Sequence, residues 1–200
     1  MMKRLMIALL MALPVMAASA QDNTWERPQT GSNADARYLA GAVPEKDGHV
    51  VFEATLQAPG KTARQVYDIM LQQLTSLTKE EGQFEQSRVS VADEQNLQIA
   101  ATYQEWLVFK STALQLDRTR LMYHLFVDCR DGEATVRMTR INYLYDEERD
   151  PTAYKAEEWI TDKYGLNKKQ TKLARVSGKF RRKTIDRKDY LFGLFAKALQ

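Results

Sequence analysis

The chain has 200 residues, of which 44% are hydrophobic and 28% are charged, and its formal net charge is +3. This length allows one ordinary domain, and the composition argues against a disordered or fibrous chain. One Cys and two His exclude an internal disulfide framework and a cysteine-rich zinc site. The chain carries no glycine-rich phosphate loop or other specific catalytic motif, so motifs alone assign no activity.

The first 20 residues have the three parts of a secretory signal peptide. Lys3 and Arg4 precede an apolar run over residues 5–16, and small residues at positions 18–20 allow cleavage between Ala20 and Gln21. We therefore predict an exported protein, in the periplasm or outside the cell, with no transmembrane segment after signal removal. An uncleaved N-terminal anchor is the alternative interpretation.

Charge is distributed unevenly along the remaining chain. Residues 167–200 carry eleven Lys or Arg and two Asp, whereas residues 21–166 carry sixteen basic and twenty-four acidic residues. Opposite charges favour docking of this basic segment on the acidic body. Between the signal peptide and the body, residues 21–47 are predicted to be a flexible linker, with Trp25 and the 38–44 patch free to pack on the domain or to meet a partner.

From His49 onward the pattern predicts regular structure. Alternating apolar residues from position 50 to 56 indicate a strand, and Pro59-Gly60 ends it. Thr62 and Gln65 form a capping box, which begins a helix that runs to about residue 78.

The middle of the chain is rich in strand signals. A polar loop at 93–96 and the Asp131-Gly132 pair indicate two hairpins. In the strand before Asp131-Gly132, alternate residues from Leu121 to Cys129 share an apolar face. The predicted strands are 88–92, 97–103, 105–110, 113–116, 121–130 and 134–145.

The C-terminal part is predicted to be helical. Asp150-Pro151 is a good helix opening and Gly165 a stop. Asn167 with Gln170 forms a second cap-like pair, and Asp186 can cap a last helix. The predicted fold is α+β, with a curved antiparallel sheet, a helix after the first strand, and C-terminal helices packed on one face. We expect an α+β domain over residues 48–146 and a basic helical extension over 147–200.

Candidate catalytic residues are few. Cys129 with a His would form a nucleophile and base, but His124 is five residues away in the same strand and points to the opposite face. We therefore expect a buried, inert thiol, with only His49 left as a partner for it. His124 and Asp128 share a face about 13 Å apart, too far for a hydrogen bond.

Acidic residues cluster at Asp146, Glu147, Glu148 and Asp150. They lack the alternating spacing and turn glycine of a calcium loop, so we interpret them as residues preceding a helix N-terminus. No catalytic residue, metal ligand or cofactor site is predicted.

The sharpest polar feature is a basic run with one aromatic residue. It is interpreted as an anion or partner contact, because guanidinium groups suit phosphates and carboxylates. The alternative interpretation is pairing with the acidic body. Export argues against a nucleic-acid partner. The residues assigned to this contact are Lys179, Arg181, Arg182, Lys183, Arg187 and Lys188.

Three segments carry a family resemblance: residues 38–44, the run 48–53 followed by Pro59-Gly60-Lys61, and the tail 178–189. Together they resemble exported proteins of Bacteroidetes that bear domain of unknown function 4468, described as having a TBP-like fold. The resemblance covers roughly residues 48–145, and the tail is similar to an extension that some members carry. It implies an α+β domain with a curved antiparallel sheet but no substrate, and no catalytic residues are carried over from it.

These observations predict a non-catalytic binding or envelope-associated module whose partner is an unidentified envelope component or protein. One alternative is a hydrolase with a site assembled across strands from His124, Asp128 or Tyr residues. Another is a self-associating structural protein that forms an oligomer through residues 38–43 or the C-terminal helix.

Overall fold

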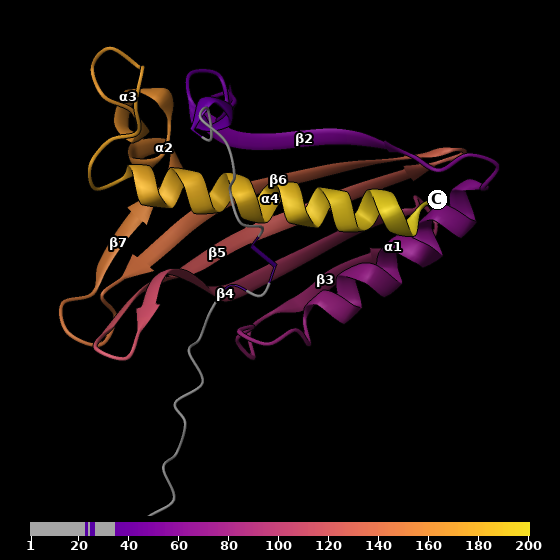
Figure 1. The fold of residues 1–200 in the computed structure, drawn as a ribbon. Helices are drawn as coiled ribbons and strands as arrows, with labels where there is room; N and C mark the ends of the chain where they lie inside the picture. The colour runs from indigo at the N-terminus through magenta and orange to yellow at the C-terminus, as the bar shows by residue number, and fades with distance from the viewer. Residues whose placement is uncertain (1–22, 24, 27–34) are drawn as a thin grey trace, which may run out of the picture.

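Three long strands form the centre of a single antiparallel sheet in the computed structural model, which describes residues 23, 25–26 and 35–200 (Figure 1). Within these residues seven strands form one sheet in the order β1-β2-β6-β5-β4-β3, and β7 pairs with β6 beyond β2. The strands are β1 Glu45–Lys46, β2 His49–Gln57, β3 Arg88–Asp93, β4 Gln98–Thr112, β5 Gln115–Arg130, β6 Glu133–Tyr145 and β7 Thr152–Lys155.

Alternation of side chains separates a core face of the sheet from an open face. Leu125 of β5 lies opposite Ala101 of β4 and Met138 of β6, and all three are buried. The neighbouring residue His124 points to the other face and is partly exposed. The predicted α+β class and the hairpins at 93–96 and 131–132 are confirmed.

The strands are longer than their local patterns predict. The segments 97–103 and 105–110 are parts of one strand, β4, and β5 begins at Gln115 directly after a short turn. In β6, Arg140 and Ile141 lie together opposite Tyr123, and Arg140 has a φ of 54°. This β-bulge shifts the alternation by one residue, so Ile141 and Tyr143 stay on the core face that Met138 occupies.

Two helices cover the core face, with α4 and α1 side by side in front of the sheet (Figure 1). Helix α1, Ala63–Leu77, begins at the predicted capping box: Thr62 accepts from the Gln65 backbone, and the Gln65 side chain accepts from Thr62 N–H. Its apolar stripe, from Val66 to Leu77, is buried against the strands. Removing an N-cap of this kind typically costs about 1 kcal/mol.

Helix α4, Gly178–Ala198, is one continuous helix rather than a segment that begins at Asp186. The predicted cap is wrong because Asp186 lies in the middle of the helix, where its carboxylate accepts a hydrogen bond from Tyr38 Oη at 2.7 Å. Phe180, Leu191 and Phe195 continue one buried stripe through this position.

The segment between β6 and α4 is mostly not helical. The predicted helix from residue 150 is replaced by β7, followed by the single-turn helices α2, Ala156–Trp159, and α3, Asp162–Gly165. Strand β2 pairs with β6 only up to Thr139, so the backbone groups beyond need another partner, and β7 supplies it from Asn142 to Tyr145. Asn167 likewise holds a turn, accepting from backbone N–H groups at 171 and 172, rather than capping a helix.

The described part of the expected linker belongs to the domain. Tyr38, in the short 3-10 helix η1 Ala36–Tyr38, and Val43 are buried in the same core as α4. The expected flexibility of residues 21–47 is therefore wrong for the buried residues among them, whereas α4 of the 147–200 extension packs on one face of the sheet. The predicted signal peptide and its cleavage position lie outside the described residues. Among those described, no helix has the length and hydrophobicity that crossing a bilayer requires.

Candidate functional site

The Cys129 thiol is sealed in the core. Its residue is 6% exposed, and burial, with a smaller effect of Asp128, raises its pKa to about 12. His124 lies on the opposite face, as predicted. His49 is also remote from the thiol. Ala134 of β6 lies between Leu56 of β2 and Cys129 of β5 in the sheet, and His49 is seven positions from Leu56 along β2. Seven positions of strand span roughly 23 Å. The described structure thus brings neither imidazole to the thiol.

His124 and Asp128 have separate partners on the open face. Asp128 forms an ion pair with Arg137 at 2.5 Å and accepts from Gln98 at 2.7 Å. The His124 ring stacks beside Phe126, with 6.2 Å between ring centroids. Burial lowers the pKa of His124, and the Arg140 guanidinium lowers it further. The two residues therefore do not form an acid–base pair.

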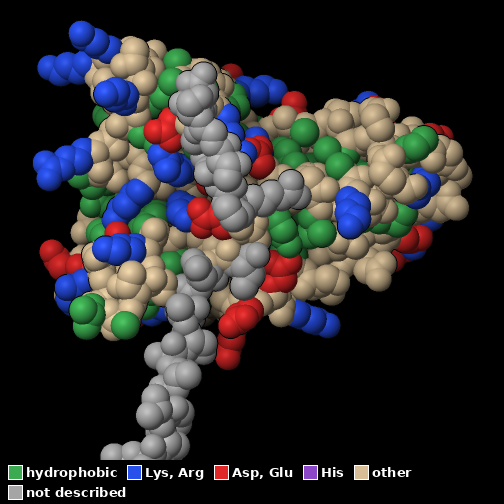
Figure 2. Space-filling view, in the orientation of Figure 1, with side chains coloured by type: hydrophobic (Ala, Val, Ile, Leu, Met, Phe, Trp, Pro, Cys, Tyr) green, Lys and Arg blue, Asp and Glu red, His purple; other side chains and the backbone are tan. Residues whose placement is uncertain are grey.

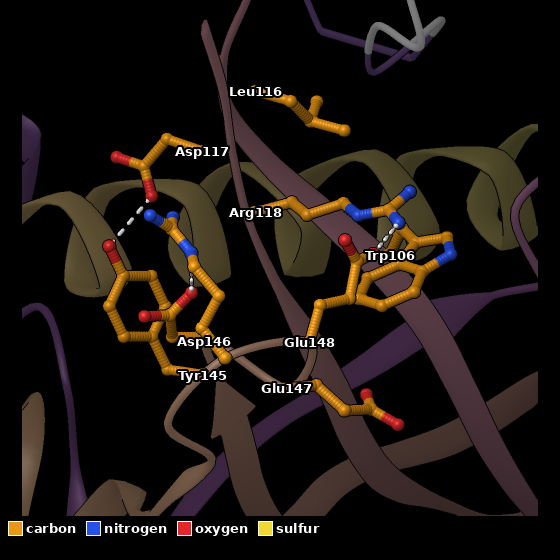
Figure 3. A pocket seen from close by; sticks show the side chains of 9 residues that line it. Trp106, Leu116, Asp117, Arg118, Tyr145, Asp146, Glu147 and Glu148 are labelled. Atoms are coloured by element: carbon orange, nitrogen blue, oxygen red, sulfur yellow. Dashed lines mark hydrogen bonds and ion pairs between the residues drawn. The ribbon is translucent and has the colours of Figure 1, made fainter.

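The acidic cluster lines a shallow hollow of about 90 Å³ at one end of the sheet (Figure 3). The interpretation as residues preceding a helix N-terminus is wrong, because β7 and not a helix follows. Instead, Glu148 pairs with Arg118 of β5 at 2.7 Å, and Glu147 pairs with Arg120. Asp146 pairs with Arg149 at 3.1 Å.

Aromatic rings complete this end of the sheet. The Arg118 guanidinium lies 3.7 Å from the Trp106 ring centroid, and the Arg120 guanidinium lies 3.9 Å from that of Phe84. The two rings pack against each other at 4.9 Å. The charged groups of the hollow are thus neutralised by neighbours, and the described residues contain no cluster of three or more metal-ligating side chains. This arrangement fixes the ends of β4, β5 and β6 in place.

Two of the six cations predicted to contact an anion lie in the interior. Arg181 is fully buried and donates to the carbonyl oxygens of Tyr38, Leu39 and Ile160 at 2.6–2.8 Å, and it pairs with Asp162. Gly165 is needed beside it, because a Cβ there would meet the Ile160 oxygen at 2.7 Å.

Arg187 is 1% exposed and forms two hydrogen bonds with Glu105, at 2.6 and 2.8 Å. It also pairs with Glu80 at 3.2 Å. The expected surface contact is therefore wrong for Arg181 and Arg187, whose donors hold the N-terminal segment and α4 to the rest of the domain.

The other four predicted cations also have acidic partners. Lys179 pairs with Asp117 at 2.7 Å, Arg182 pairs with Asp35 at 2.5 Å, Lys183 pairs with Glu26, and Lys188 pairs with Asp189. Three of them, Lys179, Arg182 and Lys183, line a cavity of about 250 Å³ together with Phe109 and Leu173.

All five cations between residues 163 and 175 are exposed and have no ion pair within the described chain; we call this set the basic end. It comprises Lys163, Lys168, Lys169, Lys172 and Arg175. Lys and Arg side chains project from the end of the molecule where α3 and β7 lie (Figure 2). Sequence reasoning missed this set, although the signal is present: residues 163–185 contain nine Lys or Arg and no Asp or Glu.

The fold and its sequence match a known family. The family model described as a domain of unknown function (DUF4468) with TBP-like fold matches residues 52–144. A crystal structure of a DUF4468 family protein from Bacteroides ovatus is 46% identical to this chain, with a TM-score of 0.77, and the alignment covers 82% of this chain and 94% of that chain. The chain belongs to the DUF4468 family.

A second solved structure supports the architecture alone. A crystal structure of a TBP-like protein from Parabacteroides distasonis has a TM-score of 0.66 at 20% identity, over 79% of this chain and 97% of that chain. A comparison with curated proteins gives no match. The predicted family and TBP-like fold are confirmed, and the family description assigns no activity.

Proposed function

We propose that this DUF4468 protein is an exported, non-catalytic binding module that holds an anionic component of the cell envelope at its basic end. The observation that carries the proposal is a surface of five exposed Lys and Arg side chains without acidic partners in the described chain. Such side chains contribute little to folding, and they retain donors that suit phosphate and carboxylate groups.

The basic end adjoins three further cations, each of which has an acidic partner. Leu173, between Lys172 and Arg175, borders the cavity lined by Lys179, Arg182 and Lys183. Because residues 163–185 contain no Asp or Glu, the cations of this stretch can pair only with acidic residues from other segments.

Binding accounts for the site better than hydrolysis does. A hydrolase needs titratable groups free to exchange protons with a substrate. The clustered carboxylates Glu147 and Glu148 are each paired with an arginine, and the hollow beside them is only about 90 Å³. The segments considered for self-association also have partners within the chain, since Tyr38 and Leu191 are buried in the core.

The proposal is tested by titrating purified protein with soluble polyphosphate at low salt. Changing Lys168, Lys169 and Lys172 together to Gln is expected to weaken binding at least tenfold, because each is exposed and the fold does not use it. The matched control changes Lys79 and Lys197, exposed cations away from the basic end, to Gln. Equal affinity of the triple variant and the control would contradict the proposal.

Export has its own test. The mature protein recovered from a Bacteroidetes host should begin at Gln21, as determined by intact mass and N-terminal sequencing. Recovery of the intact chain from the cytoplasm would refute the exported location.

A further inference from the structure

Exposed apolar side chains gather at the same end of the molecule as the exposed cations. Among the described residues, five large hydrophobic side chains are exposed, and four of them lie in the β4–β5 turn, at the start of β5, in α3, or between α3 and α4. The four are Leu114, Leu116, Tyr164 and Val176, and the fifth is Val91 of β3. Single exposed hydrophobic residues are ordinary, but four at one end alongside unpaired cations form an amphipathic surface.

The β4–β5 turn is the most exposed apolar point. Leu114 is 99% exposed and Leu116 is 45% exposed. Two hydrogen bonds to Gln115 stabilise the turn. The Thr112 side chain accepts from Gln115 N–H at 3.1 Å, and Lys110 donates to the Gln115 side chain at 2.7 Å. Neither bond involves the leucines, so Leu114 contributes nothing to the fold that requires an apolar side chain.

The turn and the basic end project from the same end of the sheet. Figure 1 places α3 at one corner of this end and the β4–β5 turn at the other, with the β6–β7 loop beside that turn. Figure 2 shows Lys and Arg side chains over this end, and hydrophobic side chains at its corner near the β4–β5 turn. A broad flat partner that meets both features also meets the β6–β7 loop, where Glu147 and Glu148 are paired with Arg120 and Arg118.

We propose that this end of the protein docks on the surface of an anionic phospholipid bilayer; this inference rests on the proposed function. Lys163, Lys168, Lys169, Lys172 and Arg175 contact lipid phosphates, while Leu114 and Leu116 enter the boundary between headgroups and acyl chains. Cations beside inserted apolar side chains are the pattern of proteins that bind a bilayer surface without crossing it.

Charge and exposure together favour a bilayer over a soluble polyanion. A soluble polyanion contacts cations alone and gives Leu114 no environment better than water. A bilayer offers apolar depth within a few ångströms of its phosphates, so the same plane satisfies Leu114 and Lys168. Added salt weakens the attraction between the exposed cations and the lipid phosphates, whereas the contribution of the inserted leucines persists at high salt.

The test is co-sedimentation of purified protein with vesicles of phosphatidylcholine alone or with about one-third phosphatidylglycerol. We expect binding to the anionic vesicles only, and about fivefold weaker binding for each cation removed from the basic end. Leu114→Gln should weaken vesicle binding about tenfold while leaving polyphosphate binding unchanged. Val91→Gln is the matched control for an exposed apolar residue, and Lys79→Gln for an exposed cation.

Each outcome decides the matter. Vesicle binding that falls in the Lys168, Lys169 and Lys172 triple variant and in Leu114→Gln, but not in the controls, supports docking on a bilayer. Polyphosphate binding without vesicle binding, or vesicle binding that Leu114→Gln leaves unchanged, overturns the bilayer inference and leaves the proposed function standing. Absence of binding to both probes overturns the two together.

Discussion

Removing the buried ion pair between Arg187 of α4 and Glu105 of β4 is the strongest test of how the C-terminal helix is held to the sheet. Changing Arg187 to Met leaves the Glu105 carboxylate in a site where its side chain is 6% exposed. Gln83 still donates to it at 2.6 Å, but the two charged hydrogen bonds from the guanidinium are lost. The guanidinium also packs 5.3 Å from the ring centroids of Trp25 and Tyr190.

An unpaired buried charge of this kind destabilises a protein by about 3–5 kcal/mol. For a domain of this size each kcal/mol lowers the Tm by roughly 2–4 °C, so Arg187→Met should lower it by roughly 6–20 °C. The assay is urea unfolding followed by tryptophan fluorescence, with the double variant Arg187→Met/Glu105→Leu as the comparison.

The double variant decides between two explanations. Replacing both charges by apolar residues of similar size is expected to restore most of the stability, because it removes the uncompensated carboxylate. If Arg187→Met unfolds at the same urea concentration as the unchanged protein, or if the double variant is less stable than the single one, the account of the pair is refuted.

Three further predictions concern other parts of the core. At pH 8, Cys129 should react with Ellman's reagent only after the protein unfolds, and rapid reaction of the folded protein would refute this. The contribution of the thiol to the free energy of unfolding should fall as the pH rises from about 9 to about 12, because the unfolded chain releases the proton that the folded chain keeps. Tyr38→Phe should lower the free energy of unfolding by about 1–2 kcal/mol, measured with urea, because the Asp186 carboxylate loses a buried hydrogen bond, and an unchanged value would mean that residues 35–47 do not support α4. Gly165→Ala should lower the Tm because of the close backbone contact at its Cβ, whereas Gly193→Ala, within α4 and with open space around it, should raise stability by about 0.5–1 kcal/mol; the reverse order would contradict the packing described.

Local signals were sufficient for much of the sheet and for α1. The capping box at Thr62 and the Asp131-Gly132 turn depend only on neighbouring residues, so the sequence pattern identifies them. Strand β7 forms because of a pairing that is not visible locally. Strand β2 does not reach the edge of β6 beyond Thr139, and residues 152–155 pair with that edge instead. No periodicity within four residues reveals that requirement.

The basic segment shows the same division between local and tertiary information. The excess of Lys and Arg after residue 163 is visible in the sequence, but exposure is not. Arg181 and Arg187 are buried against the carbonyls near Tyr38 and the carboxylate of Glu105. These partners are more than 80 residues away in the sequence, so no local pattern reveals the burial. The same separation explains why Asp186 is read as a helix cap when its partner is Tyr38.

The most direct test of the central claim is to locate the contact surface on isotopically labelled protein by NMR, adding bicelles that contain phosphatidylglycerol. The account predicts changes in backbone signals at residues 163–176 and 112–116, and little change on the open sheet face around His124. Changes confined to the open face, or none at either turn, would contradict it.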